Sequence, residues 1–279
     1  LRPKPPDALR VATQNVHYIR LNAETGAWSV SDWEQRKGPL DAAFNTLDAD
    51  LVAFQEMESF AGGHASPVNL ARDWLLARNP AYAAAATGDP ARFPATQPIL
   101  YRRDRLKALE PGWFFFSETP DALYSRTFDG SYPAFASWAR FRDRRGGAAF
   151  RVVNVHFDHA SAGNRRRSAA LVARRVAPWL EAGERVILLG DLNARLGSEP
   201  VAMLEAAGLD FLPVEGATYH FDVGINLFGA IDHVAVGPGV EPNGPPMVLR
   251  RRFEDDWPSD HYPVAADIRL SPQRADLRR

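Results

Sequence analysis

The chain has 279 residues, of which 46% are hydrophobic, and its 33 Lys and Arg nearly balance its 34 Asp and Glu. This length supplies a sizeable core, and the net charge of −1 excludes a global field that would hold a polyanion, although a local basic patch would still serve. The absence of cysteine excludes disulfides, thiolate catalysis and cysteine-ligated metals.

Apolar runs of strand length alternate along the chain with fewer helical patterns. Strands are predicted over 10–16, 51–55, 98–102, 113–116, 135–142, 150–157, 186–189, 231–236 and 262–268. Helices are predicted over 39–47, with Pro39 near the first turn, and over 70–78, 165–180 and 201–207. Because strands outnumber the helices between them, we expect an α/β (α+β) protein in which sheets pack on each other under a cover of helices.

The organisation of the chain is simple. No linker, repeat or low-complexity tract interrupts the interior, so we expect a lead-in over 1–9, a single domain over 10–270 and a tail over 271–279. We also expect no membrane span, since no apolar run approaches roughly 20 residues, and a monomer. Leu1 stands where Met would begin a chain and a Pro-rich stretch follows, so a cytoplasmic location and a secreted or periplasmic one after leader removal both stay open.

Six apolar strands or strand edges carry a carboxylate, carboxamide or imidazole at one end. The segments are Thr13-Gln14-Asn15, Gln55-Glu56, Asn154 to His159, Gly190 to Asn193, Asp232-His233 and Ser259-Asp260-His261. Each segment alone is an ordinary turn, cap or solvated edge. Burying such groups unpaired is costly, and their recurrence at six strand ends predicts that these ends converge in one cluster.

The composition of this cluster favours a hard cation. Mg²⁺ takes oxygen ligands and keeps several waters, whereas Zn²⁺ favours His or Cys sets at short spacing. The spacing of His156 and His159 is compatible with a zinc site. However, we expect both on one strand, where residues three apart point to opposite faces, and this argues against zinc.

In this order, the segments resemble the endonuclease/exonuclease/phosphatase superfamily, which includes deoxyribonucleases, abasic-site endonucleases, sphingomyelinases and inositol-phosphate phosphatases. The likeness runs from Ala12-Thr13-Gln14-Asn15 to Ser259-Asp260-His261, and Gly190-Asp191-Leu192-Asn193 is its other strong motif. It implies a four-layer sandwich, with two central mixed β-sheets packed face to face and flanked by helices. It also implies that 10–270 is a catalytic domain in which water attacks a phosphoester in line, with the help of a divalent metal.

The resemblance assigns Asn15, Glu56 and Asp260 to the metal site, for Mg²⁺ or Mn²⁺, with Glu56 as the principal ligand. One departure lies at His17, where several nucleases of the superfamily carry an acidic residue. This departure puts a second carboxylate at the metal in doubt.

The resemblance also assigns the catalytic groups. Asp191 orients or deprotonates the attacking water, and Asn193 donates a hydrogen bond to the phosphate. His261 faces the scissile phosphate with its tautomer and charge fixed by Asp232, while His156 is a second phosphate-facing or acid group. These roles suit the residue types, because a carboxylate accepts a proton and an imidazolium stabilises developing negative charge.

The substrate side is less defined. His156 to His159 and the arginine run that follows resemble a bacterial branch of the superfamily with undefined substrate range. Arg165 or Arg166 would contact phosphate or form a solvated face, and His159 and His220 would be substrate-side or structural. The phosphoester substrate is therefore a compact molecule or, alternatively, DNA or RNA. A catalytically inactive binding scaffold is disfavoured because no catalytic position is lost.

Overall fold

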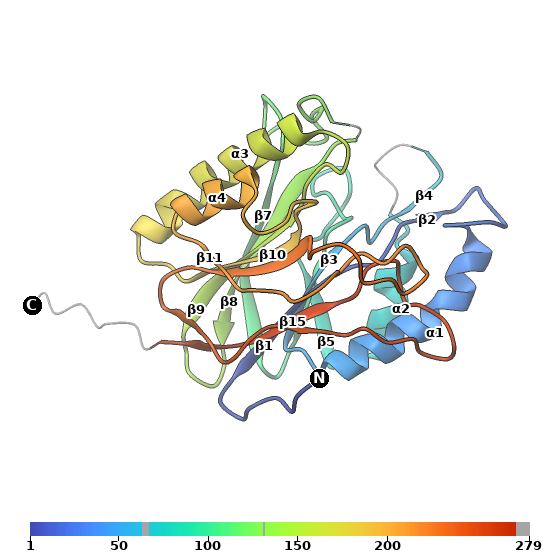
Figure 1. The fold of residues 1–279 in the computed structure, drawn as a ribbon, viewed down its shortest axis with the longest axis horizontal. Helices are drawn as coiled ribbons and strands as arrows, with labels where there is room; N and C mark the ends of the chain where they lie inside the picture. Colours follow the sequence, from blue (N-terminus) through green and yellow to red (C-terminus); the bar gives the residue numbers. More distant parts are fainter. Residues whose placement is uncertain (63–66, 131, 272–279) are drawn as a thin grey trace, which may run out of the picture.

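The computed structural model describes residues 1–62, 67–130 and 132–271. Over these residues the chain forms four layers, in which two β-sheets face each other at the centre (Figure 1). The helices are α1 (Val30–Leu47), α2 (Leu70–Arg78), α3 (Ala162–Glu181) and α4 (Glu199–Ala206). Since α1 and α2 cover one outer face and α3 and α4 the other, the predicted sandwich is confirmed.

Sheet 1 is built from both ends of the chain. Its strands are β1 (Leu9–Asn15), β3 (Leu51–Gln55), β5 (Tyr82–Ala85), β6 (Ile99–Arg102), β13 (Val240–Pro242), β14 (Met247–Val248) and β15 (Val264–Leu270). The order is β13-β15-β1-β3-β6-β5, with β14 also paired to β15. β1 runs parallel to β3 and antiparallel to β15, and buried Arg10 and Asp267 join β1 to β15 through a 2.7 Å ion pair.

Sheet 2 is built from the middle of the chain. Its strands are β7 (Leu106–Phe115), β8 (Phe135–Asp143), β9 (Ala149–His156), β10 (Val186–Asp191), β11 (Asp210–Phe211) and β12 (Asp232–Val236). The order is β11-β12-β10-β9-β8-β7, and β9 runs parallel to β10. A short separate pair, β2 (Ile19–Arg20) and β4 (Ser59–Phe60), lies next to the end of β3.

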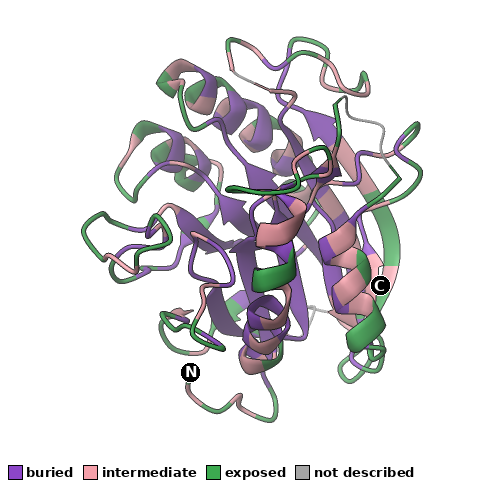
Figure 2. Cartoon of the chain, turned by 90° about the vertical axis from the view of Figure 1, so that its right-hand side faces the viewer, coloured by how far each residue is buried: buried purple, intermediate pink, exposed green. Residues whose placement is uncertain are grey.

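Apolar side chains separate each pair of layers. One cluster fills the space between the sheets and includes Val11, Phe141 and Ile187, while two others lie between each sheet and its helices. In Figure 2 most strands are buried, and exposed positions lie mainly in loops and on the outer sides of helices, with the edge strand β7 as an exception. Among the described residues, no helix has the length and apolar character needed to cross a membrane.

The predictions place the start of two elements, α1 and β7, later in the sequence than the structure does. α1 starts at its N-cap Ser29, so Pro39 lies inside the helix and not near its first turn. The preceding turns are held by buried Trp33 and Arg36, whose packing overrides the proline signal. β7 begins at Leu106, before the predicted start at 113. Its first half was missed because it is an exposed edge strand, whose polar and Pro-Gly sequence hides the strand pattern.

Other boundaries agree with the prediction to within a few residues, except at the short strands. β2, β4, β5, β11, β13 and β14 were not predicted, because two to four residues are too few to show a periodicity. The division into lead-in, domain and tail stays a prediction, and 272–279 of the tail lie outside the described residues.

Buried carboxamides connect the two sheets beneath the polar strand ends. The Gln55 side chain at the end of β3 donates to Asn154 Oδ1 in β9 over 2.7 Å. Asn154 Nδ2 in turn donates to the carbonyls of Phe54 at 2.8 Å and Gln97 at 3.2 Å. Gln55 and Asn154 are fully buried. This connection fixes how far one sheet can slide over the other.

We expect Asn154→Ala to lower the free energy of unfolding by about 2 kcal/mol or more, since it leaves several buried partners without a hydrogen bond. Urea unfolding measures the change. Asn45→Ala is the matched control, because its amide bonds only Asp41 on the same helix and the residue is exposed. Equal losses in the two variants would show that the inter-sheet connection has no special weight.

Candidate active site

The strand ends of both sheets meet at one edge of the sandwich. In sheet 1, Asn15 at the end of β1 is in register with Gln55 at the end of β3, and Glu56 follows directly. In sheet 2, Asp191 at the end of β10 lies between His156 of β9 and Asp232 of β12. Parallel neighbours end together, and this geometry converts a scattered sequence pattern into a cluster.

The backbone takes unusual conformations where these strands end. Glu56 and Asn193 both have left-handed backbones, with φ of 53° and 46°. Such conformations cost about 1–3 kcal/mol each and persist where the surroundings enforce them. Gly190 approaches β9 so closely that a Cβ atom there would lie 1.9 Å from the Val155 carbonyl oxygen. Glycine at this position therefore allows Asp191 to reach the cluster.

Asp191 occupies the centre of the cluster and is buried. Its Oδ2 accepts a hydrogen bond from Asn15 Nδ2 at 3.3 Å and lies 3.7 Å from His156 Nε2. Asn15 Nδ2 also donates to Glu56 Oε1 at 3.1 Å, and the same Glu56 oxygen is 3.7 Å from His156 Nε2. Asn15 thus presents its amide hydrogens to both carboxylates, and its own oxygen accepts from the His17 backbone.

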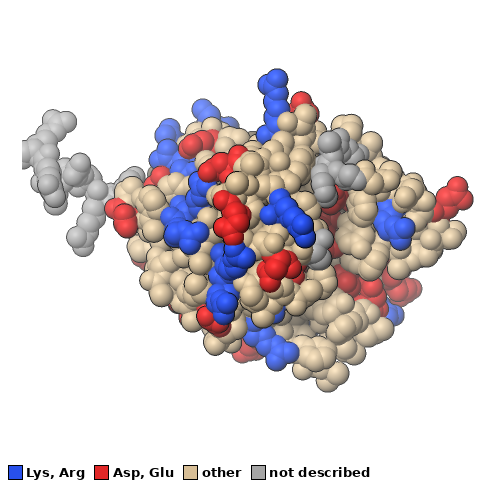
Figure 3. Space-filling view, turned by 90° about the horizontal axis from the view of Figure 1, so that it is seen from above, with Lys and Arg blue, Asp and Glu red and all other residues tan. Residues whose placement is uncertain are grey.

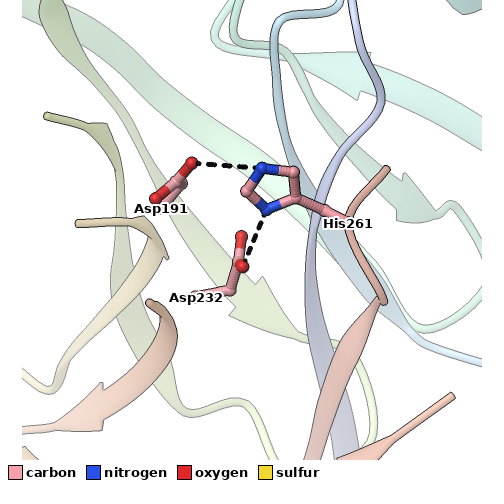
Figure 4. A group of neighbouring side chains, drawn as sticks. All are labelled: Asp191, Asp232 and His261. Atoms are coloured by element: carbon pink, nitrogen blue, oxygen red, sulfur yellow. Dashed lines mark hydrogen bonds and ion pairs between the residues drawn. The ribbon is translucent and has the colours of Figure 1, made fainter. Parts of the chain in front are cut away.

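His261 lies between two carboxylates (Figure 4). Its Nδ1 is 2.9 Å from Asp232 Oδ2, and its Nε2 is 3.8 Å from Asp191 Oδ2. Burial by itself lowers the pKa of His261, but the charge and hydrogen bond of Asp232, followed by Asp191 and Asp260, raise it well above 6.5. Burial, followed by the charge of Asp232, raises the pKa of Asp191 to about 6. The imidazole is therefore held as a cation beside a carboxylate that can take up a proton near neutrality.

Asn193 and Asp260 complete the group of predicted catalytic and metal residues. The Asn193 backbone donates to Asp191 Oδ1 at 2.8 Å, and its side chain donates to the Phe157 carbonyl at 2.9 Å. Asp260 Oδ2 is 3.6 Å from His17 Nε2. Burial, opposed by the charge of Asp260, lowers the pKa of His17 to about 4.

The predicted substrate-binding residues do not all reach this cluster. Arg165 donates to the carbonyls of Asp158 and His159, and exposed Arg166 lies 3.8 Å from Glu199. His159 is exposed on the loop after β9, so the expectation that it shares a strand with His156 is wrong: β9 ends at His156.

His220 is fully enclosed. Its ring stacks on Tyr262 with centroids 4.0 Å apart and packs against Trp257 at 4.6 Å. Burial, followed by the charge of His261, lowers the pKa of His220 to about 4. Its backbone N–H donates to the Asp260 carbonyl at 2.8 Å. His220 therefore packs beneath the Asp260-His261 segment and offers no surface to a substrate here.

Sequence reasoning missed several residues around the cluster. The Tyr132 hydroxyl lies 3.3 Å from His156 Nε2. Thr218 Oγ1 accepts the backbone N–H of Asp232 at 3.1 Å and so fixes the start of β12. Burial, followed by the charge of Glu56, raises the pKa of Glu58 to about 7. Tyr132 and Thr218 come from loops and Glu58 from a short connection, where no periodic pattern marks them.

Two sets of donors can be considered for a metal ion. The ligand atoms of Asp191, Asp232 and His261 lie within 4.8 Å of one another, close enough to hold one ion. The second set is the predicted one, in which the partly exposed carboxylates of Glu56 and Asp260 supply hard oxygen ligands. Asn15 and His17 connect these two carboxylates: Asn15 donates to Glu56 Oε1 and accepts from the His17 backbone, and the His17 ring lies 3.6 Å from Asp260 Oδ2.

The model of the Endonuclease/Exonuclease/phosphatase family matches residues 12–261, which include every residue of the cluster. The chain belongs to this family. Its members are hydrolases that act on phosphoesters and generally use a divalent metal. The family predicted from the strand-end motifs is thus confirmed. No protein of curated function matches the chain in sequence.

Solved structures of the family share the fold. An endonuclease/exonuclease/phosphatase family protein from Bacteroides thetaiotaomicron has a TM-score of 0.77 at 24% identity, covering 95% of this chain and 98% of its own. A mannosyl-6-phosphatase from the same organism has a TM-score of 0.75 at 24% identity, covering 93% and 99%. D. rerio TDP2 complexed with a single-strand DNA product has a TM-score of 0.65 at 17% identity, covering 94% and 99%.

We expect Asp232 and His261 to act as one unit. Asp232→Asn and His261→Ala should each lower kcat by at least ~10²-fold, and the double variant should be no worse than His261→Ala alone. Steady-state kinetics on a generic aryl phosphoester measure these losses. Asp210→Asn, an exposed position on neighbouring β11, serves as the control. Losses that simply multiply in the double variant would show that the two residues act independently.

Proposed function

We propose that this chain is a divalent-metal-dependent hydrolase that cleaves a phosphoester bond in a compact substrate. The observation that carries the proposal is the position of Asp191, a buried carboxylate shared by Asn15, His156 and His261 where the two sheets meet. Groups that move protons and stabilise negative charge are expected to surround a reacting phosphate in this way.

The donor set fits Mg²⁺ or Mn²⁺ better than a soft metal. We place the ion at Glu56 and Asp260, because the alternative set would break the short Asp232–His261 hydrogen bond. Asn15 donates its amide hydrogens to Glu56 and Asp191, so it orients Glu56 here, and direct ligation would require its amide to turn over. When bound, the ion would polarise a phosphate oxygen and neutralise developing charge.

The protein groups divide the remaining chemistry. Asp191, with its pKa raised to about 6, accepts a proton from the attacking water. Cationic His261, oriented by Asp232, stabilises negative charge on the phosphate oxygens. His156, bonded to the Tyr132 hydroxyl, is suited to the leaving-group side. Asn193 donates one side-chain N–H to the Phe157 carbonyl, and the other has no partner among the described residues and can donate to phosphate.

We expect Glu56→Gln to weaken the binding of Mn²⁺ by at least about tenfold and to remove most activity while leaving the fold intact. Calorimetric titration of Mn²⁺ into the protein measures the affinity, with Glu205→Gln on the exposed side of α4 as the control. Asp232→Asn should retain the affinity, because we place the metal elsewhere. Unchanged Mn²⁺ binding in Glu56→Gln, or full activity in chelator, would contradict this site.

The distribution of charge supports a compact substrate over a long nucleic acid. On the face shown in Figure 3, basic and acidic side chains are interspersed and form no continuous basic tract. Arg165 and Arg166, the nearest dense basic run by sequence, are engaged by loop carbonyls and by Glu199. A nuclease stays the second candidate, since a relative of the same fold was solved with a single-strand DNA product.

Substrate class can be tested by comparing kcat/KM on small phosphoesters with that on plasmid and single-stranded DNA at two salt concentrations. We expect higher values for the small substrates and little salt dependence, because duplex binding depends on several phosphate contacts that salt weakens steeply. Efficient, salt-sensitive DNA cleavage with negligible turnover of small substrates would favour the nuclease.

A further inference from the structure

A cavity of about 350 Å³ opens directly beside the cluster and shares Glu56 and His156 with it. Its walls are mainly aromatic, with Tyr18, Phe60 and Phe135 among the rings. This volume is at the lower end of the roughly 300–1,000 Å³ typical of small-molecule sites. The cavity therefore suits one ring-sized group and not a nucleic acid strand.

The charge of the cavity limits what this group can be. None of the described lining residues is Lys or Arg, and the sequence has neither at 63–66 or 131. Two of the lining residues, Glu56 and Glu58, are acidic. A second phosphate would find no Lys or Arg among these residues and would meet the acidic side chain of Glu58, so the group bound in the cavity carries none.

Glu58 points to a ligand that donates hydrogen bonds. Its half-buried carboxyl lines the cavity, and no described side chain or backbone group donates to it. The half-buried Thr96 hydroxyl lines the same cavity and is likewise without a described partner. Polar atoms surrounded by aromatic walls lose water when a ligand enters, so the ligand must replace those hydrogen bonds.

We propose that this cavity binds the alcohol part of the substrate, and that this alcohol is a hydroxyl-rich ring of sugar size bearing a single phosphate. Its hydroxyls donate to Glu58 and exchange hydrogen bonds with Thr96, while its C–H faces pack on the aromatic rings. The phosphate then lies between the cavity and Asp191. The inference rests on the proposed hydrolase activity and names the substrate class of that same site.

The test compares kcat/KM for a hexose 6-phosphate, a hexose bisphosphate, phosphocholine, a nucleoside 5′-monophosphate and phenyl phosphate, all with Mn²⁺. We expect the hexose monophosphate to be best and the bisphosphate at least ~10²-fold worse, because the site has no partner for its second phosphate. A higher value for phosphocholine or the nucleotide would assign the cavity to a cation or a base and overturn the proposal.

Variants of the cavity give the sharper result. Glu58→Gln should lower the ratio of kcat/KM for hexose phosphate over phenyl phosphate at least about tenfold, mainly through KM, since phenyl phosphate has no ring hydroxyls. Thr96→Val should lower the same ratio, and it covers the case in which Glu58→Gln does not fold. Glu205→Gln on α4 is again the control.

The two levels of proposal fail in different ways. No metal-dependent turnover of any phosphoester would refute the hydrolase itself. Turnover in which Glu58→Gln and Thr96→Val slow all substrates equally would leave the hydrolase standing and refute the assignment of the cavity.

Discussion

The hydrogen bond between Gln55 and Asn154 is the contact on which the rest of this structure depends. It joins the sheets at the level where their strands end, and both side chains are fully buried. Apolar packing alone would permit small slides of one sheet over the other, because dispersion and burial are not directional. A buried hydrogen-bonded pair is directional, so it fixes the relative position of Glu56, which follows Gln55, and of His156, two residues beyond Asn154.

The same constraint gives the active site its electrostatic character. Asp191 ends β10 of sheet 2 and His261 lies just before β15 of sheet 1, and each perturbs the proton affinity of the other. Burial alone would lower the pKa of His261. Asp232 places a negative charge next to the ring and raises this pKa instead. The pKa values of Asp191 and His261 therefore depend on the relative position of the two sheets, and a shift of either sheet would change them.

Much of the fold could be predicted because polar residues follow apolar runs of strand length, most clearly at Asp191, which ends β10. The start of α1 could not, because tertiary burial of Trp33 outweighs the local signal of Pro39. Side chains in or next to a strand end, such as Asp191 and His261, could be assigned to one cluster from the sequence. Tyr132 could not, because its contact with His156 depends on loop packing that no local pattern encodes.

Sheet 1 also has a consequence for biosynthesis. β15 lies between β13 and β1, and the Arg10–Asp267 pair within it joins residues 257 positions apart. A nascent chain cannot form this pairing, or place His261 beside Asp191, until nearly all of the described chain has left the ribosome. Contacts of such long sequence separation form late and slowly. The emerging protein therefore cannot assemble the candidate active site before β15 has been synthesised.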